Sequence, residues 1–349
     1  MYNNHTKSTT SHSGLAGGIL KLADQTGLIR VGRQLFSKSL TVINYHRIDN
    51  PHQPDFDSFK PNISASPPMF AEQMDYLKRW FNVVSVNDVV QWLHGKHDLP
   101  PYAALITFDD GYLDNYTQAY PILRKNNFPA VIFLTTGHIE TDAPFYWDMA
   151  AYCFFHTSKD HVTFPDKSER SWNGSAQKES VSNAWIEALK LLPDSEKQNW
   201  AGQLSERLNV SIPANYFKNL MVNWEQVQEM NQNGIEFGGH TINHPILSRI
   251  SPENARMEIE GSKLRIEQET GKEVLSFAYP NGMKNDLNPT LELLVAQAGY
   301  KAAFTLSNGP SSLREVKSNP FAIRRIFISH THTMAHYAAL TNPINRYRK

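Results

Sequence analysis

Two adjacent carboxylates, Asp109 and Asp110, stand at the end of an apolar run and directly before Gly111. The run over residues 103–106 is continuously apolar, which predicts a short buried strand ending close to the two acids. Paired acids in such a position usually take part in chemistry, because a carboxylate can bind a metal ion or exchange a proton. This pair is therefore the first candidate for a functional site.

Two histidines four residues apart, His240 and His244, form a second candidate group. Their spacing lets both imidazoles face one metal ion. One aspartate and two histidines would provide three protein ligands and leave a position open for water, which is the composition of a catalytic site rather than a structural one. Each motif alone has little specificity, since Asp-Asp-Gly more often marks a turn, but their joint occurrence after predicted strands favours a metal site.

Strand-like and helix-like segments alternate along most of the chain, and they must position these side chains. Helical spacing predicts helices over residues 70–81 and 116–125, a short helix from a cap at Asn87 to Trp92, and a helix over residues 252–270. Seven or eight strands between such helices indicate an α/β barrel or a doubly wound sheet. Apolar runs predict these strands over residues 40–45, 83–86, 103–106, 130–134, 235–237, 274–278, 302–305 and 322–327.

The positions of the polar candidates favour the barrel. His46 follows the first predicted strand, Asp109 and Asp110 follow the third, and His240 and Tyr279 follow two later ones. Each therefore stands just past the C-terminal end of a strand, and catalytic groups in α/β barrels gather on that face. Residues that are far apart in the sequence would then converge on one mouth.

The alternating pattern stops between about residues 141 and 222. This interval is rich in Ser, Asn, Lys and Asp and contains an amphipathic stretch over residues 184–208, so it predicts an insertion that forms a small helical cap. A solvated decoration and a substrate-facing lid both stay open as interpretations. The predicted organisation is an N-terminal helical extension over residues 1–38, followed by a barrel over residues 39–340 that carries the insertion.

Composition and charge exclude several classes of protein. The 349 residues include 34 Lys+Arg and 34 Asp+Glu, so there is no excess of positive charge for binding nucleic acid, and a neutral or weakly charged substrate fits better. The single cysteine, Cys153, cannot form an intrachain disulfide. The polar start has no secretory pattern, which predicts a cytoplasmic enzyme. Residues 15–36 predict either a helix packed on the barrel or an amphipathic helix at the inner face of the membrane.

Three motifs together resemble the polysaccharide deacetylase family, also called NodB-homology or carbohydrate esterase 4. They are Thr-Phe-Asp-Asp-Gly-Tyr at residues 107–112, Phe-Pro-Ala-Val-Ile-Phe-Leu-Thr-Thr-Gly at 128–137, and His-x-x-x-His at 240–244. The resemblance covers about residues 40–330 apart from the insertion. It implies a distorted (β/α)7 barrel that removes N-acetyl groups from amino sugars with a divalent metal, commonly zinc, with cobalt or nickel as alternatives.

The resemblance also implies a role for each motif residue. Carried over by position, Asp109 is the general base, while Asp110, His240 and His244 hold the metal ion. The family usually offers an arginine before the proline of its third motif, whereas Tyr279 comes before that proline here. The group that steadies the base is therefore missing locally, and Arg324 or Arg325 are the candidates to replace it.

Two histidines are candidates for the acid that protonates the leaving amine. The C-terminal Leu-x-His motif of the family is absent, although His330 lies near its expected place. Residues 42–46, Val-Ile-Asn-Tyr-His, resemble the acid motif of the poly-β-1,6-N-acetylglucosamine deacetylase branch, where an N-terminal histidine serves. We therefore predict His46 as the acid and keep His330 as the alternative.

Substrate contacts are expected around the same mouth. The backbone amide of Tyr112 is the expected donor to the carbonyl oxygen on which charge develops. The rings of Tyr112, Trp147 and Tyr279 are candidates for stacking on a sugar, with packing in the core as the alternative. Asn281 and Arg325 complete the expected substrate contacts.

Three functions are compatible with these residues. The first is a metal-dependent N-deacetylase that acts inside the cell on a lipid-linked or nucleotide-linked precursor of a cell-surface polysaccharide. The second is a glycan-binding barrel that keeps the metal but has lost turnover, since the third motif is altered. The third is a deacylase for another amide or imide. The intact Asp109 favours the first function, and the sequence predicts no oligomeric state.

Overall fold

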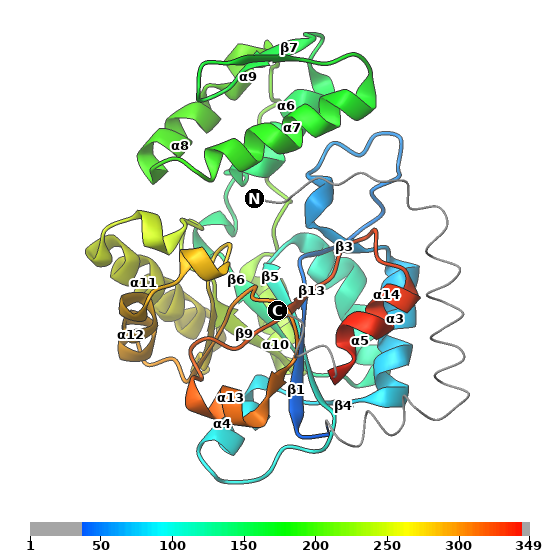
Figure 1. The fold of residues 1–349 in the computed structure, drawn as a ribbon, viewed down its shortest axis with the longest axis vertical. Helices are drawn as coiled ribbons and strands as arrows, with labels where there is room; N and C mark the ends of the chain where they lie inside the picture. Colours follow the sequence, from blue (N-terminus) through cyan, green and yellow to red (C-terminus); the bar gives the residue numbers. More distant parts are fainter. Residues whose placement is uncertain (1–36, 344–349) are drawn as a thin grey trace.

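The computed structural model describes residues 37–343, and its centre is a sheet of parallel strands (Figure 1), whose pairing curls it into a ring. The residues of the ring are almost all buried, as expected for parallel strands with helices on the outside. Along the sheet the order is β11-β10-β9-β6-β5-β1, with β13 beside β1. In chain order the seven strands are β1 (Ser39–Tyr45), β5 (Ala103–Asp110), β6 (Ala130–Leu134), β9 (Ile235–Gly239), β10 (Ser276–Ala278), β11 (Ala302–Phe304) and β13 (Ile326–Phe327).

The ring closes through the segment after β11. β13 pairs in parallel with β1, while Ile323 forms a single parallel bridge with Phe304 at the end of β11. The predicted strand over residues 322–327 is therefore regular only at β13, because its two ends pair with different neighbours. The result is the distorted (β/α)7 barrel that the sequence predicted.

Helices cover the outside of the ring. α11 begins after Ser251 and ends before Gly271, as predicted. α4 begins earlier than expected, because Ser85 rather than Asn87 is its cap and shares reciprocal hydrogen bonds with Asp88. The helices of the barrel are α3 (Pro67–Trp80), α4 (Val86–Leu93), α5 (Tyr120–Asn126), α10 (Trp224–Gln232), α11 (Pro252–Thr270), α12 (Pro289–Gln297), α13 (Leu313–Ser318) and α14 (Met334–Thr341).

Short elements form the connections. The early cap of α4 also shortens the strand predicted over residues 83–86, which ends at Val83. The short strands are β2 (Arg47–Ile48), β3 (Ile63–Ala65), β4 (Asn82–Val83) and β12 (Ser311–Ser312). The short helical turns are η1 (Lys60–Asn62), η2 (Asn115–Ala119), η3 (Thr136–His138), η4 (Leu247–Arg249) and η5 (Lys284–Asp286).

The predicted insertion is a helical body with its own apolar core, drawn in green at the top of Figure 1. Trp185 and Cys153 are fully buried in this core. The amphipathic stretch over residues 184–208 is not one helix, because Pro193 interrupts it before α8. The elements of the insertion are α6 (Tyr146–His156), β7 (His161–Thr163), β8 (Glu169–Ser171), α7 (Ser175–Leu189), α8 (Asp194–Gly202) and α9 (Leu204–Leu208).

The N-terminal helix predicted over residues 15–36 lies outside the described residues. Within residues 37–343, no helix combines the length and the apolar character needed to cross a membrane.

Candidate metal centre and active site

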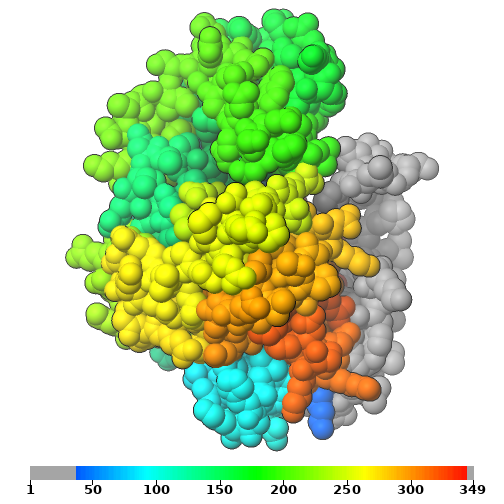
Figure 2. Space-filling view, turned by 90° about the vertical axis from the view of Figure 1, so that its left-hand side faces the viewer, coloured from blue at the N-terminus to red at the C-terminus, as the bar shows by residue number. Residues whose placement is uncertain are grey.

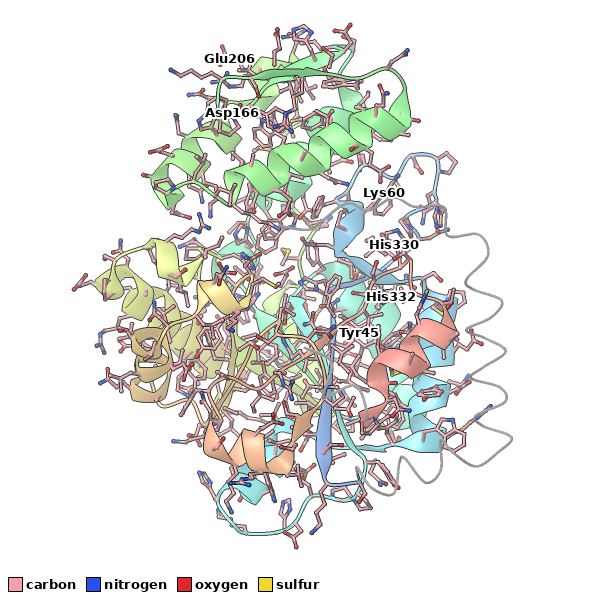
Figure 3. The ribbon with its side chains drawn as sticks, viewed as in Figure 1. Tyr45, Lys60, Asp166, Glu206, His330 and His332 are labelled. Carbon is pink, nitrogen blue, oxygen red and sulfur yellow. The ribbon has the colours of Figure 1, made fainter. Side chains whose placement is uncertain are left out.

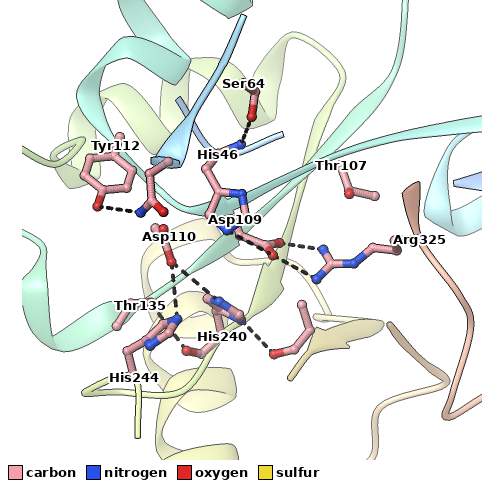
Figure 4. A network of polar contacts seen from close by, with 12 residues as sticks. His46, Ser64, Thr107, Asp109, Asp110, Tyr112, Thr135, His240, His244 and Arg325 are labelled. Atoms are coloured by element: carbon pink, nitrogen blue, oxygen red, sulfur yellow. Dashed lines mark hydrogen bonds and ion pairs between the residues drawn. The ribbon is translucent and has the colours of Figure 1, made fainter. Parts of the chain in front are cut away.

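Asp109 and Asp110 are the last two residues of β5, and their carboxylates serve different parts of the site (Figure 4). The chain turns sharply here, since Asp110 has φ 76° and Gly111 has φ 87°. A Cβ atom at Gly111 would lie 2.6 Å from Cδ2 of Leu134 on the neighbouring strand β6, so only glycine fits. This turn directs Asp109 toward Arg325 and Asp110 toward two histidines that follow β9.

Asp110, His240 and His244 form a compact group of possible metal ligands. The Asp110 Oδ1 atom lies 3.5 Å from Nε2 of His240 and 3.5 Å from Nε2 of His244, and one ligand atom from each residue lies within 4.8 Å of the others. Neither oxygen of the buried Asp110 carboxylate accepts a hydrogen bond from any described residue. Burial raises the pKa of Asp110, so its ionised form needs a compensating cation, and these three residues fit a divalent metal.

The surroundings of the two histidines fix their orientation. The Nδ1 atom of His240 lies 2.7 Å from the carbonyl oxygen of Ala278, so Nδ1 donates and Nε2 is left as the ligand atom. His244 packs edge-on against Trp147 and Phe145, with ring centroids 4.9 Å and 5.6 Å away. Burial lowers the pKa of both imidazoles, which keeps them neutral and suited to metal binding.

Asp109 forms a bidentate ion pair with Arg325. Nη1 of Arg325 lies 2.6 Å from Oδ1 of Asp109, Nη2 lies 2.8 Å from Oδ2, and Nε donates to the carbonyl oxygen of Thr305. Burial alone would raise the pKa of Asp109, but the buried guanidinium outweighs it and lowers that pKa to about 2. Of the two candidate arginines, Arg325 is therefore the one that pairs with the predicted base and can replace the arginine missing before Pro280. Arg324 instead pairs with the exposed Glu315.

His46 lies next to the same carboxylate. Its Nε2 atom is 3.9 Å from Oδ2 of Asp109, and its backbone is held by hydrogen bonds with Ser64 and Asn115. Burial lowers the pKa of His46 to about 4, against the opposing effect of Asp109. His330 lies elsewhere, beside β3, where its Nδ1 atom contacts the carbonyl oxygen of Ile63 (Figure 3).

Several expected substrate contacts differ from the structure. Tyr112 and Tyr279 have 0% and 1% of their surface exposed, so neither ring has a free face for a sugar. The Tyr279 hydroxyl donates to the carbonyl oxygen of Phe321, which keeps its ring in the core of the barrel. Asn281 donates to the carboxylate of Asp286 and braces the loop after β10. The expectation that the rings of Tyr112 and Tyr279 stack on a sugar is therefore wrong, because both rings are packed in the core.

The insertion reaches the site through α6, which carries Trp147, one of the residues that the sequence indicated. The Tyr112 hydroxyl donates to Oδ2 of Asp148 over 2.7 Å and accepts a hydrogen bond from Nε1 of Trp147 over 2.7 Å. Trp147 in turn packs on His244 and stacks on Phe145, with ring centroids 4.5 Å apart. Phe145 and Trp147 are 2% and 6% exposed, so most of their ring surface packs beside the proposed metal site.

Comparison with known proteins identifies the family. The family model described as polysaccharide deacetylase matches residues 96–303. A putative polysaccharide deacetylase of Bacillus subtilis is 24% identical over 228 residues, which are 64% of this chain and 51% of the relative. A poly-β-1,6-N-acetyl-D-glucosamine N-deacetylase of Staphylococcus aureus is 32% identical over 108 residues, 29% of this chain and 37% of the relative. The chain thus spans about half the length of the first relative and less of the second.

Solved structures share the architecture. The deacetylase PplD of Streptococcus pyogenes, solved with acetate, has a TM-score of 0.58 and 19% identity and covers 87% of this chain and 98% of its own. IcaB from Ammonifex degensii has a TM-score of 0.53 and 20% identity and covers 87% of this chain and 97% of its own. At these identities the likeness shows the fold. Together with the family model, which matches more than half of the residues, it shows that this chain belongs to the polysaccharide deacetylase family.

Proposed function

We propose that this protein is a metal-dependent hydrolase that removes N-acetyl groups from amino sugars of a glycan. The observation that carries the proposal is the Asp110, His240 and His244 group directly beside the Asp109–Arg325 pair and His46. The name of the Staphylococcus aureus relative, which specifies N-deacetylation of a poly-β-1,6-linked amino sugar, supports this choice of substrate class.

The metal ion would be held by Asp110, His240 and His244, with zinc as the first candidate and cobalt or nickel as alternatives. Such an ion supplies a Lewis acid that lowers the pKa of a water molecule toward 7. Asp109 is the base that accepts a proton from the attacking water, and Arg325 keeps this carboxylate ionised and fixed in place. The oxygen of that water bonds to the acetyl carbon while negative charge develops on the carbonyl oxygen.

The backbone amide of Tyr112 is the proposed donor to that oxygen. Within residues 37–343 this N–H has no hydrogen-bond partner, since the neighbouring backbone bonds join Gly111 and Leu113 to the chain near Met221. The Tyr112 side chain is fixed by Asp148 and Trp147, which holds the amide in position. The expected role of the Tyr112 backbone is therefore compatible with the burial of its ring.

His46 is the proposed acid for the departing amine. Nε2 of His46 lies 3.9 Å from Oδ2 of Asp109, so His46 is placed to take the proton that Asp109 accepts from the water. His46 then protonates the amine nitrogen as the C–N bond breaks, and acetate and a free amino sugar are released.

The test is acetate release from N-acetylglucosamine oligomers by the purified protein, as isolated, after chelation, and after zinc, cobalt or nickel is restored. We expect release that a chelator abolishes and a metal restores. Asp109→Asn should bind the metal but lose turnover, whereas His240→Ala should lose both. Equal metal loss in the two variants, measured as bound metal per protein, would contradict the assigned roles.

The structure weakens one of the two alternative functions, the binding-only barrel, and leaves the other, a different amide substrate, to experiment. The hypothesis of a binding-only barrel depended on the altered third motif, and the ion pair between Arg325 and Asp109 removes that reason. A different amide substrate would show as release of the corresponding carboxylic acid from other N-acyl compounds, without acetate release from N-acetylglucosamine oligomers. The cytoplasmic precursor substrate stays a prediction, which fractionation of cells and analysis of the glycan in each fraction would test.

A further inference from the structure

A cavity of about 550 Å³ lies between the insertion and the barrel. Figure 2 shows the insertion, in green, directly above the yellow segment that contains α11. Tyr146, Trp147 and Gln198 line the cavity from the insertion, and His244, Asn254 and Met257 line it from the barrel side. Ligand sites commonly have volumes of about 300–1,000 Å³, so this cavity has the size of a binding site.

The cavity is adjacent to the metal centre, because His244 belongs to both. The imidazole of His244 contacts the ring of Trp147 edge-on, with centroids 4.9 Å apart, and both side chains line the cavity. The Asp110 carboxylate lies 3.5 Å from the Nε2 atom of the same imidazole. A molecule in the cavity would therefore lie against one proposed metal ligand, His244, and close to a second, Asp110.

The charged groups around the cavity are already paired. The Lys197 ammonium lies 2.6 Å from Oδ1 of Asp194 on the preceding turn of α8. The Glu258 carboxylate accepts hydrogen bonds from the backbone amides of Ile242 and Asn243 at 2.7 Å and 2.8 Å. A charged ligand would have to displace these partners, so the cavity favours a neutral one.

The remaining polar groups suit hydroxyl groups. The side-chain amides of Gln198 and Asn254 form no hydrogen bond within the described part of the chain, and each offers both a donor and an acceptor. Tyr146 adds an aromatic ring with a polar end. Aromatic surface combined with free amides is the chemistry that recognises a neutral sugar.

We propose that this cavity binds the neutral sugar units that flank the reacting N-acetylated unit, so that the insertion selects oligosaccharides over single sugars. This inference rests on the proposed function for the identity of the reacting unit. It assigns the insertion as the substrate-facing lid rather than the solvated decoration.

The test uses substitutions on the cavity-facing helix α11. Met257 has 60% of its surface exposed at the wall of the cavity, so Met257→Trp fills space there without disturbing the core. Leu264 lies two turns further along the same helix, is 57% exposed and does not line the cavity, which makes Leu264→Trp the matched control. Gln198→Ala separately removes one free amide from the opposite wall.

We expect kcat/KM of the metal-loaded protein to rise with the number of sugar units, from N-acetylglucosamine to its hexamer. Met257→Trp should lower kcat/KM for the hexamer about tenfold more than for the single sugar, which corresponds to about 1.4 kcal/mol. Gln198→Ala should change this ratio in the same direction, and Leu264→Trp should leave it unchanged. Equal losses at every length, or no length dependence in the unsubstituted protein, would overturn the inference.

Calorimetric titration with the same oligomers separates this inference from the proposed function. If no oligomer releases acetate, the proposed function fails, but hexamer binding that weakens in Met257→Trp and persists in Leu264→Trp would still support the cavity as a glycan site. If acetate is released while binding of the hexamer is equal in all three proteins, the function stands and the inference fails. Absence of hexamer binding by the unsubstituted protein would also overturn it.

Discussion

At the scale of single residues, the base depends on a partner that is 216 positions away in the chain. Arg325 is fully buried, and its guanidinium donates hydrogen bonds to the Asp109 carboxylate and to the carbonyl oxygen of Thr305. Without this cation, burial would favour the protonated form of Asp109, which cannot accept a proton. The ion pair is therefore a requirement for the base as well as for the fold.

Replacing Arg325 tests this requirement. We expect Arg325→Met to lower the free energy of unfolding by about 3–5 kcal/mol, because a buried carboxylate loses its cation. Arg325→Lys should recover part of this stability but not the bidentate geometry, so its kcat should stay low. Arg324→Met is the control, since the partly exposed Arg324 pairs with an exposed carboxylate and should cost less than about 1 kcal/mol. Similar losses in urea denaturation of Arg324→Met and Arg325→Met would refute the argument.

The choice between the two candidate acid histidines can also be tested at this scale. His46→Gln should lower kcat by about 10²–10⁴-fold, the usual contribution of a positioned acid or base, with the bound metal unchanged. His330→Gln should retain nearly full kcat, because His330 contacts Ile63 and has no described contact with Asp109 or the three metal ligands. Rate measurements at saturating substrate, with metal content determined on the same samples, decide between them. A large loss in His330→Gln alone would reverse the assignment.

At the scale of elements, β5, β9 and α6 each bring one part of the site. The ends of β5 and β9 carry the three metal ligands, and α6 supplies Trp147 against His244 and Asp148 against Tyr112. Asp148 is 1% exposed, and burial raises its pKa to about 6 although Arg47 and the Tyr112 hydroxyl oppose this. The folded protein therefore keeps the proton of Asp148 up to a higher pH than the unfolded chain does.

Asp148→Asn should become more stable relative to the unsubstituted protein as the pH rises. The pKa of Asp148 is about 6 in the folded state and 3.8 in the reference state, so the folded protein binds the proton more tightly. The contribution of Asp148 to the free energy of unfolding is therefore favourable below pH 4. About 3 kcal/mol of it is lost as the pH rises through 6. Denaturation in the presence of a chelator at pH 4, 5, 6 and 7 measures the difference between the two proteins. A difference that stays constant with pH would contradict the raised pKa.

The parts of the site that depend on local pattern could be predicted from the sequence. The apolar runs before Asp109 and His240 mark strands, and residues that follow parallel strands meet at one edge. The sequence narrowed the partner of Asp109 to two arginines but could not choose between them. The choice depends on how the last segment, β13, pairs with β1 and closes the ring. Asp148 had no signal at all, since its burial depends on the docking of the insertion. Tyr112 and Tyr279 were misjudged because aromatic residues near a site look the same whether packed or open.

At the scale of the whole molecule, the proposed metal ligands connect parts of the chain that are far apart in the sequence. Asp110 belongs to β5, His240 and His244 follow β9, and His244 also contacts the insertion through Trp147. A ligand that binds the folded state alone stabilises every part that its site connects. In the absence of the ion, the buried Asp110 carboxylate lacks any described hydrogen-bond donor and opposes this assembly.

Zinc should therefore raise the melting temperature of the protein. At a free zinc concentration 100 times the dissociation constant, the stabilisation is about 2.7 kcal/mol, which corresponds to a shift of several degrees. His244→Ala should lose most of this shift because it removes one of three ligands, while His332→Ala should keep it, since His332 lies apart from these ligands near α14 (Figure 3), with its ring centroid 6.0 Å from that of His336. Thermal unfolding of the three proteins with a chelator and with buffered zinc measures the effect. An equal shift in the unsubstituted protein and in His244→Ala would place the stabilising zinc elsewhere, whereas a shift lost only in His244→Ala would tie the stability of the barrel to the site that the deacetylation proposal requires.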